Sequence, residues 1–312
     1  MRATLAAIQL DGAPAEPDDR IAEIDARLRE AAQRGARLAA LPEMCLYGYE
    51  LTDLHFRRAE PVPGPSTDVL HTLARRHDLI VVAGLTEIAD GEFYNTLVMV
   101  GPGGLLGRYR KMHVSAQENA FWKCAGAPAP IMTDLGRIGL GICADMLHPT
   151  PWRHYRDAVD LVVICAAWPD LRKAHPMPMP PRFRDAHLAV TREVPEKVSR
   201  LLGVPVVFCN ACGALDTPLP VSGRLHARFG ARSRIVDGKT LVDDQDAAQP
   251  VVLTAEVELG TARRAIGSWD DAWLPHGNPL FRNVLTQTDR LLGVLHRPLY
   301  GWNRRSHADA DV

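Results

Sequence analysis

Hydrophobic and polar positions along this chain alternate in blocks that favour short buried strands and amphipathic helices. Short apolar runs bounded by turn residues are typical of buried strands, whereas longer stretches with a helical apolar spacing are typical of amphipathic helices. Strands are expected near residues 4–9, 37–44, 79–88, 94–102, 104–113, 137–143, 161–167, 204–211, 228–236 and 251–257. Helices are expected near residues 18–34, 66–77, 151–159 and 191–202.

The order of these elements predicts a mixed sheet covered by helices. Strands alternate with helices at the start of the chain and again after residue 137, as in βα units. The strand candidates between residues 79 and 113 follow one another directly, which favours antiparallel hairpins. The turn pair Asp237-Gly238 and the run at 251–257 suggest a last hairpin. The fold class is therefore α/β or α+β.

The composition of the chain indicates which kinds of molecule it can bind. The chain has 312 residues, of which 46% are hydrophobic and 23% charged, so it can bury a sizeable core. Its 36 basic and 37 acidic residues nearly cancel, which argues against nucleic acid or an anionic membrane and favours a small-molecule partner. No apolar stretch approaches the ~18 residues of a spanning helix. Because Gln9 and Asp11 interrupt the first apolar segment before a secretory core forms, we expect a cytoplasmic protein.

The six cysteines are too sparse for a disulfide scaffold, so reduced thiols are expected. Cys209 and Cys212 form a lone C-x-x-C pair, with no second pair or histidine cluster at zinc spacing. A buried strand end is therefore favoured over a metal or redox site.

One cysteine stands where an apolar strand is expected to end. The run 138–142 stops at Cys143, and α/β folds place their chemistry at the carboxyl ends of such strands. An inert, buried thiol is the simplest interpretation. A dinucleotide fingerprint is a second, since Gly139, Gly141 and Ala144 have its spacing, but these glycines lie inside the apolar run instead of opening a helix. The third, a nucleophile, requires a base and an electrostatic partner elsewhere.

Two further strand ends supply these groups. Glu43 follows the apolar residues 38–42, and Lys111 follows the strand candidate that begins at residue 104. Each charge alone is typical of a solvated strand end. Together with Cys143 they form a sufficient set for acyl transfer: a base, a cation for the developing oxyanion and a soft nucleophile.

The segments around these three residues carry a family resemblance. Glu43 in LPEMCLYGY, Lys111 in YRKMHV and Cys143 in GICADM resemble, in order, the three signature blocks of the nitrilase superfamily of carbon–nitrogen hydrolases, and the similarity extends over roughly residues 3–260. The resemblance implies a four-layer α-β-β-α sandwich, a Glu-Lys-Cys triad, a homodimer or larger homo-oligomer, and no metal or organic cofactor. Residues 1–265 would form the hydrolase domain, and residues 266–312 a C-terminal extension for oligomer or lid contacts.

The resemblance also assigns expected roles to neighbouring residues. Glu118 matches the family's frequent second glutamate and would orient Lys111 and the incoming water. The oxyanion would be held by Lys111 and by the backbone N–H of Ala144. With Lys111 nearby, a lowered pKa is expected for the Cys143 thiol. The remaining candidates for binding the substrate or supporting the site are Tyr49, His113, Asn119 and Trp168.

The residues after Cys143 bear on the substrate. Nitrilases of the family usually place Trp-Glu directly after the cysteine, whereas this chain has Ala144-Asp145, which favours an amide or N-carbamoyl substrate, as in the amidase and carbamoylase branches. A nitrile-hydrolysing nitrilase, a thioester-based acyltransferase and a non-catalytic binding member are the alternatives. The segment 168–184 is either a solvated lid or a cationic mouth for an acidic substrate. Its basic residues are Arg172, Lys173, Arg182 and Arg184.

Overall fold

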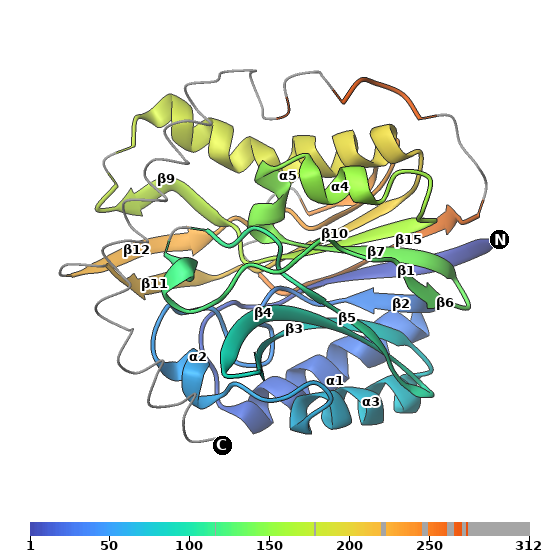
Figure 1. The fold of residues 1–312 in the computed structure, drawn as a ribbon, viewed down its shortest axis with the longest axis horizontal. Coiled ribbons are helices and arrows are strands. Elements are labelled where there is room, and N and C mark those ends of the chain that lie inside the picture. The colour runs from blue at the N-terminus through green and yellow to red at the C-terminus, as the bar shows by residue number, and fades with distance from the viewer. Residues whose placement is uncertain are drawn as a thin grey trace.

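In the computed structural model, the described residues form two six-stranded β-sheets that face each other between two layers of helices (Figure 1). The structure describes residues 1–115, 117–177, 179–219, 223–244, 249–260, 265–269 and 273. The helices and sheets form a four-layer α-β-β-α sandwich, which confirms the fold expected from the sequence.

The elements of the described residues have the following bounds. The strands are β1 (Arg2–Gln9), β2 (Ala36–Ala40), β3 (Ile80–Ala89), β4 (Glu92–Gly101), β5 (Gly104–Arg110), β6 (Ile131–Thr133), β7 (Gly136–Ile142), β8 (Leu161–Ala166), β9 (Pro169–His175), β10 (Val206–Asn210), β11 (Ala214–Pro218), β12 (Arg224–Phe229), β13 (Arg234–Asp237), β14 (Lys239–Asp243) and β15 (Val251–Glu258). The helices are α1 (Pro17–Gln33), α2 (Leu54–Arg57), α3 (Pro65–His77), α4 (Thr150–His154) and α5 (Pro181–Leu202), with short 3₁₀ turns η1 (Glu118–Ala120) and η2 (Cys143–Leu147).

The first sheet has the strand order β15-β1-β2-β3-β4-β5. Strands β1, β2 and β3 run parallel, and β3, β4 and β5 form an antiparallel meander. Side chains alternate between its faces: Leu5 and Ala7 pack toward the second sheet, whereas Ala6 and Ile8 pack in the cluster under α1 and α3. Both faces of the sheet are therefore buried, which explains the nearly continuous apolar runs in the sequence.

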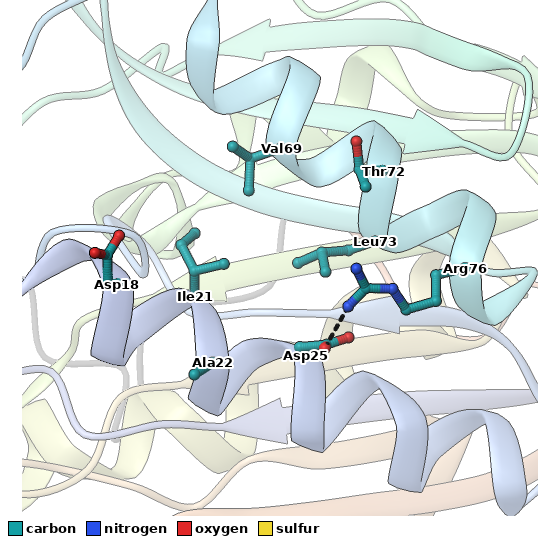
Figure 2. Close-up of a pocket in the computed structure, with 8 residues that line it drawn as sticks. All are labelled: Asp18, Ile21, Ala22, Asp25, Val69, Thr72, Leu73 and Arg76. Carbon is teal, nitrogen blue, oxygen red and sulfur yellow. Dashed lines mark hydrogen bonds and ion pairs between the residues drawn. The ribbon is translucent and has the colours of Figure 1, made fainter.

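A groove of about 320 Å³ lies between α1 and α3 on the outer face of their layer (Figure 2). Apolar side chains, among them Ile21, Val69 and Leu73, line it, and the Asp25–Arg76 ion pair joins the two helices across it. None of its lining residues is among the candidate site residues.

The second sheet has the order β14-β13-β10-β8-β7-β6, with β7, β8 and β10 parallel. Helices α4 and α5 cover its outer face (Figure 1). A small third sheet, ordered β11-β12-β9, lies beside the sandwich. The parallel strands direct their carboxyl ends to the same edge, which is where such folds place functional side chains.

The two glycines inside β7 make room for the aromatic side chains around α4. A Cβ atom at Gly141 would lie 2.4 Å from the Trp152 ring, and one at Gly139 would lie 3.0 Å from the Tyr155 ring. Since β7 runs through both glycines and ends in a 3₁₀ turn, they serve helix–sheet packing and not dinucleotide binding.

The cysteines are unpaired in the structure. All six cysteines are free, and both Cys209 and Cys212 are buried. Cys209 lies in β10, where its Sγ contacts the carbonyl of Ile8 at 3.1 Å between the two sheets. The C-x-x-C pair is therefore a buried strand end, as the sequence favoured.

Several elements differ from the sequence-based expectation. Helix α5 begins at Pro181 instead of residue 191, because proline is favoured in the first turn of a helix. Helix α4 ends at His154 instead of residue 159, and Asp157, with φ of 58°, prevents its continuation. The run 228–236 is divided between β12 and β13, which belong to different sheets.

The prediction of a last hairpin was wrong in part. Asp237-Gly238 does join β13 to β14, but β15 crosses to the first sheet and pairs antiparallel with β1. Pairing between residues so far apart in sequence has no local signature.

Most of the expected C-terminal extension, residues 266–312, lies outside the described residues. Of its described part, the Ile266 N–H donates to the carbonyl of Arg200 in α5 at 2.8 Å, and Nε1 of Trp273 donates to the carbonyl of Met146 in η2 at 2.8 Å. Among the helices the structure describes, none is long and apolar enough to cross a membrane.

Candidate active site

The structure brings the four predicted catalytic side chains into one buried cluster. Glu43 follows β2 of the first sheet, Lys111 directly follows β5, and Cys143 directly follows β7 of the second sheet. Glu118 lies in η1, on the connection between β5 and β6. All four residues are buried. The cluster therefore depends on the two sheets facing each other.

The Lys111 ammonium lies between two carboxylates. Its Nζ donates to Oε1 of Glu43 at 2.7 Å, and to Oε1 and Oε2 of Glu118 at 2.6 and 2.9 Å. Burial alone lowers the pKa of a lysine, but Glu118 and Glu43 outweigh it and raise the pKa of Lys111 above its ordinary value. The side chain is therefore a buried cation in a fixed position.

Glu43 accepts hydrogen bonds from both sheets. Besides Lys111, its Oε1 accepts from Nδ2 of Asn95 in β4 at 2.7 Å, and its Oε2 accepts from the N–H of Ala167, after β8, at 2.9 Å. Burial raises the pKa of Glu43 above its ordinary value, although Lys111 opposes the shift. A raised pKa makes this carboxylate the better proton acceptor of the two glutamates.

Glu118 has the opposite tendency. Besides Lys111, it accepts hydrogen bonds from the hydroxyl of Tyr49 at 2.8 Å and from the N–H of Ser115 at 2.6 Å. Burial opposes ionisation, but Lys111 and these donors lower the pKa of Glu118 below its ordinary value. Glu118 thus stays a carboxylate that holds the lysine.

The Cys143 thiol differs from the sequence-based expectation. A lowered pKa was expected from the nearby lysine, but burial raises the pKa of Cys143 well above its ordinary value. The negative charge of the Glu43 carboxylate adds to this effect and outweighs the opposite effect of Lys111. The resting group is therefore a thiol beside a carboxylate and not a free thiolate.

The backbone is strained beside two of these side chains. Cys143 has φ of 43°, and Met44, directly after Glu43, has φ of 53°. Such left-handed conformations cost roughly 1–3 kcal/mol at non-glycine residues and cluster at functional sites. Gly84 in β3 passes so close that a Cβ there would lie 2.6 Å from the Met44 nitrogen, so the strand can pass only because it carries glycine here.

The structure also places the other candidates from the sequence. Tyr49 joins the cluster through Glu118, and Ala144 is buried in η2 directly after the nucleophile candidate. The His113 ring stacks on His148 at 3.9 Å between centroids, and Nδ2 of Asn119 donates to the Ser115 carbonyl. Their roles in substrate or oxyanion binding stay predictions.

Trp168 is buried where the chain leaves β8, and its side chain contacts α5. Its indole Nε1 donates to the carbonyl of His187 at 3.0 Å, and its ring stacks on the His187 ring at 4.4 Å. Its backbone N–H donates to Oδ1 of Asn210 at 2.7 Å. These contacts fix the position of the residue, while contact with the substrate stays a prediction.

His187 makes stability depend on pH. Burial lowers its pKa from 6.5 to about 4, so the folded protein keeps the ring neutral while the unfolded chain protonates it. Stability from this group is present above about pH 6.5 and is lost as the pH falls toward about 4. We expect His187→Phe, which keeps an aromatic ring on Trp168, to remove about 1–2 kcal/mol of the loss in unfolding free energy between about pH 6.5 and about pH 5.

Denaturant unfolding at the two pH values measures this difference. A His154→Phe variant, which replaces an exposed histidine away from Trp168, is the matched control and shows how much of the change comes from removing any histidine. An unchanged pH dependence in His187→Phe would contradict the assignment.

Two of the four basic residues of segment 168–184 bind groups of the same segment, and the other two are exposed. Arg172 pairs with Asp170 at 2.8 Å, and the Arg184 guanidinium donates to the carbonyls of Met177 and Met179, each at 2.6 Å. Lys173 and Arg182 are exposed. Arg184 therefore holds its own segment together, and a cationic mouth for an acidic substrate would rest chiefly on Lys173 and Arg182.

Sequence reasoning gave no role to three groups at the site. Asn95 is a lone amide within an apolar strand, and a buried polar side chain of this kind needs a hydrogen-bond partner. Its partner in the structure is Glu43. The backbone N–H of Ala167 has no sequence signature at all. Asp145 was noted only for its place after Cys143, yet it is fully buried. Among the described residues, no group of three or more His, Cys, Asp or Glu side chains is arranged to hold a metal ion.

Comparison with known proteins gives one matching family model and several similar relatives. A family model described as carbon-nitrogen hydrolase matches residues 4–266. A nitrilase from Pyrococcus abyssi is 33% identical over 150 residues, which cover 46% of this chain and 57% of that protein. The omega-amidase NIT2 of Homo sapiens is 33% identical over 153 residues, which cover 46% and 55%. The chain spans about half the length of the curated relatives it matches.

Solved structures share the fold. The amidase from Nesterenkonia sp. AN1, with acrylamide added at its active-site cysteine, aligns with a TM-score of 0.66 at 18% identity, over 82% of this chain and 93% of that chain. Nit3 from Saccharomyces cerevisiae, a member of branch 10 of the nitrilase superfamily, aligns with a TM-score of 0.67 at 19% identity, over 92% and 94%. At these identities the likeness supports the fold.

Proposed function

The chain belongs to the carbon–nitrogen hydrolase family, and on this premise we propose that it hydrolyses a small amide or N-carbamoyl compound through a thioester on Cys143. The observation that supports the proposal is the buried cluster in which Lys111 joins Glu43 and Glu118 beside the Cys143 thiol. A thiol, a base and a fixed cation are the groups that acyl transfer requires.

In the first half of the reaction, Glu43 takes the thiol proton while the Cys143 sulfur attacks the carbonyl carbon. The raised pKa of Glu43 favours this transfer, and the raised pKa of Cys143 means that the proton leaves only as the bond forms. The Lys111 ammonium and the Ala144 N–H stabilise the oxyanion. The carbon–nitrogen bond then breaks, Glu43 protonates the departing nitrogen, and ammonia or an amine leaves.

In the second half, water replaces the amine. Glu43, again a carboxylate, removes a proton from water as its oxygen attacks the thioester carbon. Collapse of the second tetrahedral intermediate releases the acid and returns the proton to the Cys143 sulfur. Throughout, Glu118 keeps Lys111 charged and in place, because it stays ionised and accepts two bonds from the ammonium.

An amide or N-carbamoyl carbonyl is proposed over a nitrile because Ala144-Asp145 replaces the Trp-Glu pair of the family's nitrilases. From the resemblance to the nitrilase superfamily, we also propose that residues 1–265 form the hydrolase domain and that the protein is a homodimer or a larger homo-oligomer.

A panel of substrates tests the proposal. Purified protein is incubated with neutral amides, acidic amides, N-carbamoyl amines and nitriles, with ammonia release measured and Cys143 adducts detected by mass spectrometry. We expect release from at least one amide or N-carbamoyl compound, together with an acyl adduct on the peptide that contains Cys143.

Other outcomes distinguish the alternatives. Preferential turnover of nitriles would indicate a nitrilase, and acyl transfer that rises with added amine would indicate an acyltransferase. If no compound reacts and Cys143 resists a mild alkylating agent, the protein is a non-catalytic member of the family.

A further inference from the structure

Asp145 is a buried carboxylate that accepts three hydrogen bonds from two segments of the candidate active site. Its Oδ2 accepts from the Tyr109 hydroxyl at 2.7 Å and from the Ile142 N–H at 2.9 Å. Its Oδ1 accepts from the His113 N–H at 2.9 Å. The side chain is fully buried, so these donors replace its hydration.

The donors belong to the two segments that carry the reacting groups. Ile142 directly precedes Cys143, whereas Tyr109 and His113 lie on either side of Lys111. The Tyr109 hydroxyl also accepts from the Met112 N–H at 3.2 Å, so the backbone after the lysine is held at two successive residues. Asp145 therefore ties the lysine segment directly to the strand end that presents the thiol.

Backbone and ring contacts extend this connection. The Lys111 N–H donates to the Asn95 carbonyl at 2.8 Å, and the His148 N–H donates to the Asp145 carbonyl at 3.1 Å. The stacked His113 and His148 rings then join the two segments a second time, beyond the carboxylate.

We propose that Asp145 is a positioning residue that fixes the Lys111 ammonium relative to the Cys143 sulfur. The proposal deepens the proposed function and rests on it for the roles of Lys111 and Cys143. A cation aimed at a developing oxyanion has to be held within a fraction of an ångström, and a displacement of about 1 Å can reduce the rate about a hundredfold.

The chemistry of the contacts requires a carboxylate. Three donors point at two oxygens, so every group facing the side chain needs an acceptor. An asparagine can keep its oxygen toward Tyr109 and Ile142, but its NH₂ group then faces the His113 N–H, where two donors meet. Asp145→Asn therefore preserves the volume of the residue and breaks the connection to the lysine segment.

The test compares Asp145→Asn with Tyr109→Phe and with a matched control. Glu87→Gln is that control, because Glu87 is also a fully buried carboxylate, bonded to Thr96, Arg108 and Arg110 and outside the proposed machinery. For each variant, kcat and KM on the best amide, the rate of Cys143 alkylation by iodoacetamide, and the unfolding temperature are measured.

We expect Asp145→Asn to lower kcat about 10- to 100-fold with KM changed less than about threefold. Alkylation of Cys143 should slow, because a displaced Lys111 no longer lowers the pKa of the thiol. Tyr109→Phe should show the same pattern with a smaller effect, and it serves alone if Asp145→Asn does not fold. Glu87→Gln should change the unfolding temperature but neither kcat nor the alkylation rate.

Wild-type kcat and alkylation rate in both Asp145→Asn and Tyr109→Phe would overturn the proposal, as would equal losses in Glu87→Gln. If the wild type hydrolyses no compound, the proposed function fails, while the alkylation rates still decide whether Asp145 positions Lys111 against the thiol.

Discussion

Replacing Cys143 by alanine should lower amide hydrolysis at least about 10³-fold while the fold stays intact. The substitution removes the sulfur on which the thioester forms, so the covalent route is lost. General acid–base catalysis and positioning by the remaining groups supply only about 10²–10⁴-fold over the uncatalysed reaction. Only one buried sulfur atom is deleted, and the strained φ of 43° is the same for alanine, so the unfolding temperature should change little.

Steady-state hydrolysis and thermal unfolding measure both parts of this expectation. Cys212→Ala is the matched control, because Cys212 is also buried and free but is not among the proposed catalytic residues. It should keep near wild-type activity. If Cys143→Ala retained more than about a hundredth of the wild-type rate, a group other than Cys143 would be the nucleophile.

Replacing Lys111 by methionine should abolish activity and also destabilise the protein. The oxyanion loses its cation, and Glu43 and Glu118 are left as two buried carboxyl groups without the ammonium between them. Breaking a buried ion pair by removing one partner costs about 3–5 kcal/mol. Hydrolysis of the best amide and denaturant unfolding at neutral pH give the two quantities.

A double variant separates catalysis from stability. Lys111→Met combined with Glu118→Gln removes the second buried charge, so it should recover part of the lost unfolding free energy without recovering hydrolysis. Return of activity in the double variant would mean that Lys111 only neutralises the glutamates. Near-normal activity in Lys111→Met alone would exclude the lysine from the proposed triad.

The part of the site that could be predicted from the sequence consists of the ionisable residues at the ends of predicted strands. Glu43, Lys111 and Cys143 each stand where an apolar run stops, and a carboxylate, an ammonium and a thiol allow acyl transfer. The family resemblance then gave the fold and brought in Glu118. The structure confirms the sandwich and brings these side chains together.

The strand pairings and hydrogen-bond partners that could not be predicted from the sequence depend on contacts between distant segments. The run that became β15 has a clear strand pattern, but its partner is β1, at the other end of the described chain. Asn95 and the Ala167 N–H meet Glu43 only because the two sheets face each other. In the same way, Asp145 could be read as an acid after the cysteine but not as the group that bonds Tyr109 and His113.

The strand and helix periods, the residue types at the strand ends and, through the resemblance, the family of the chain follow from the sequence alone. These features depend on local spacing and on side-chain chemistry, which do not require contacts between distant segments. The pairing of the strands and the pKa of each ionisable group depend on how the chain folds. The Cys143 thiol is an example: the nearby lysine lowers its pKa, but burial and the charge of Glu43 raise the pKa more, and both effects arise only in the folded protein.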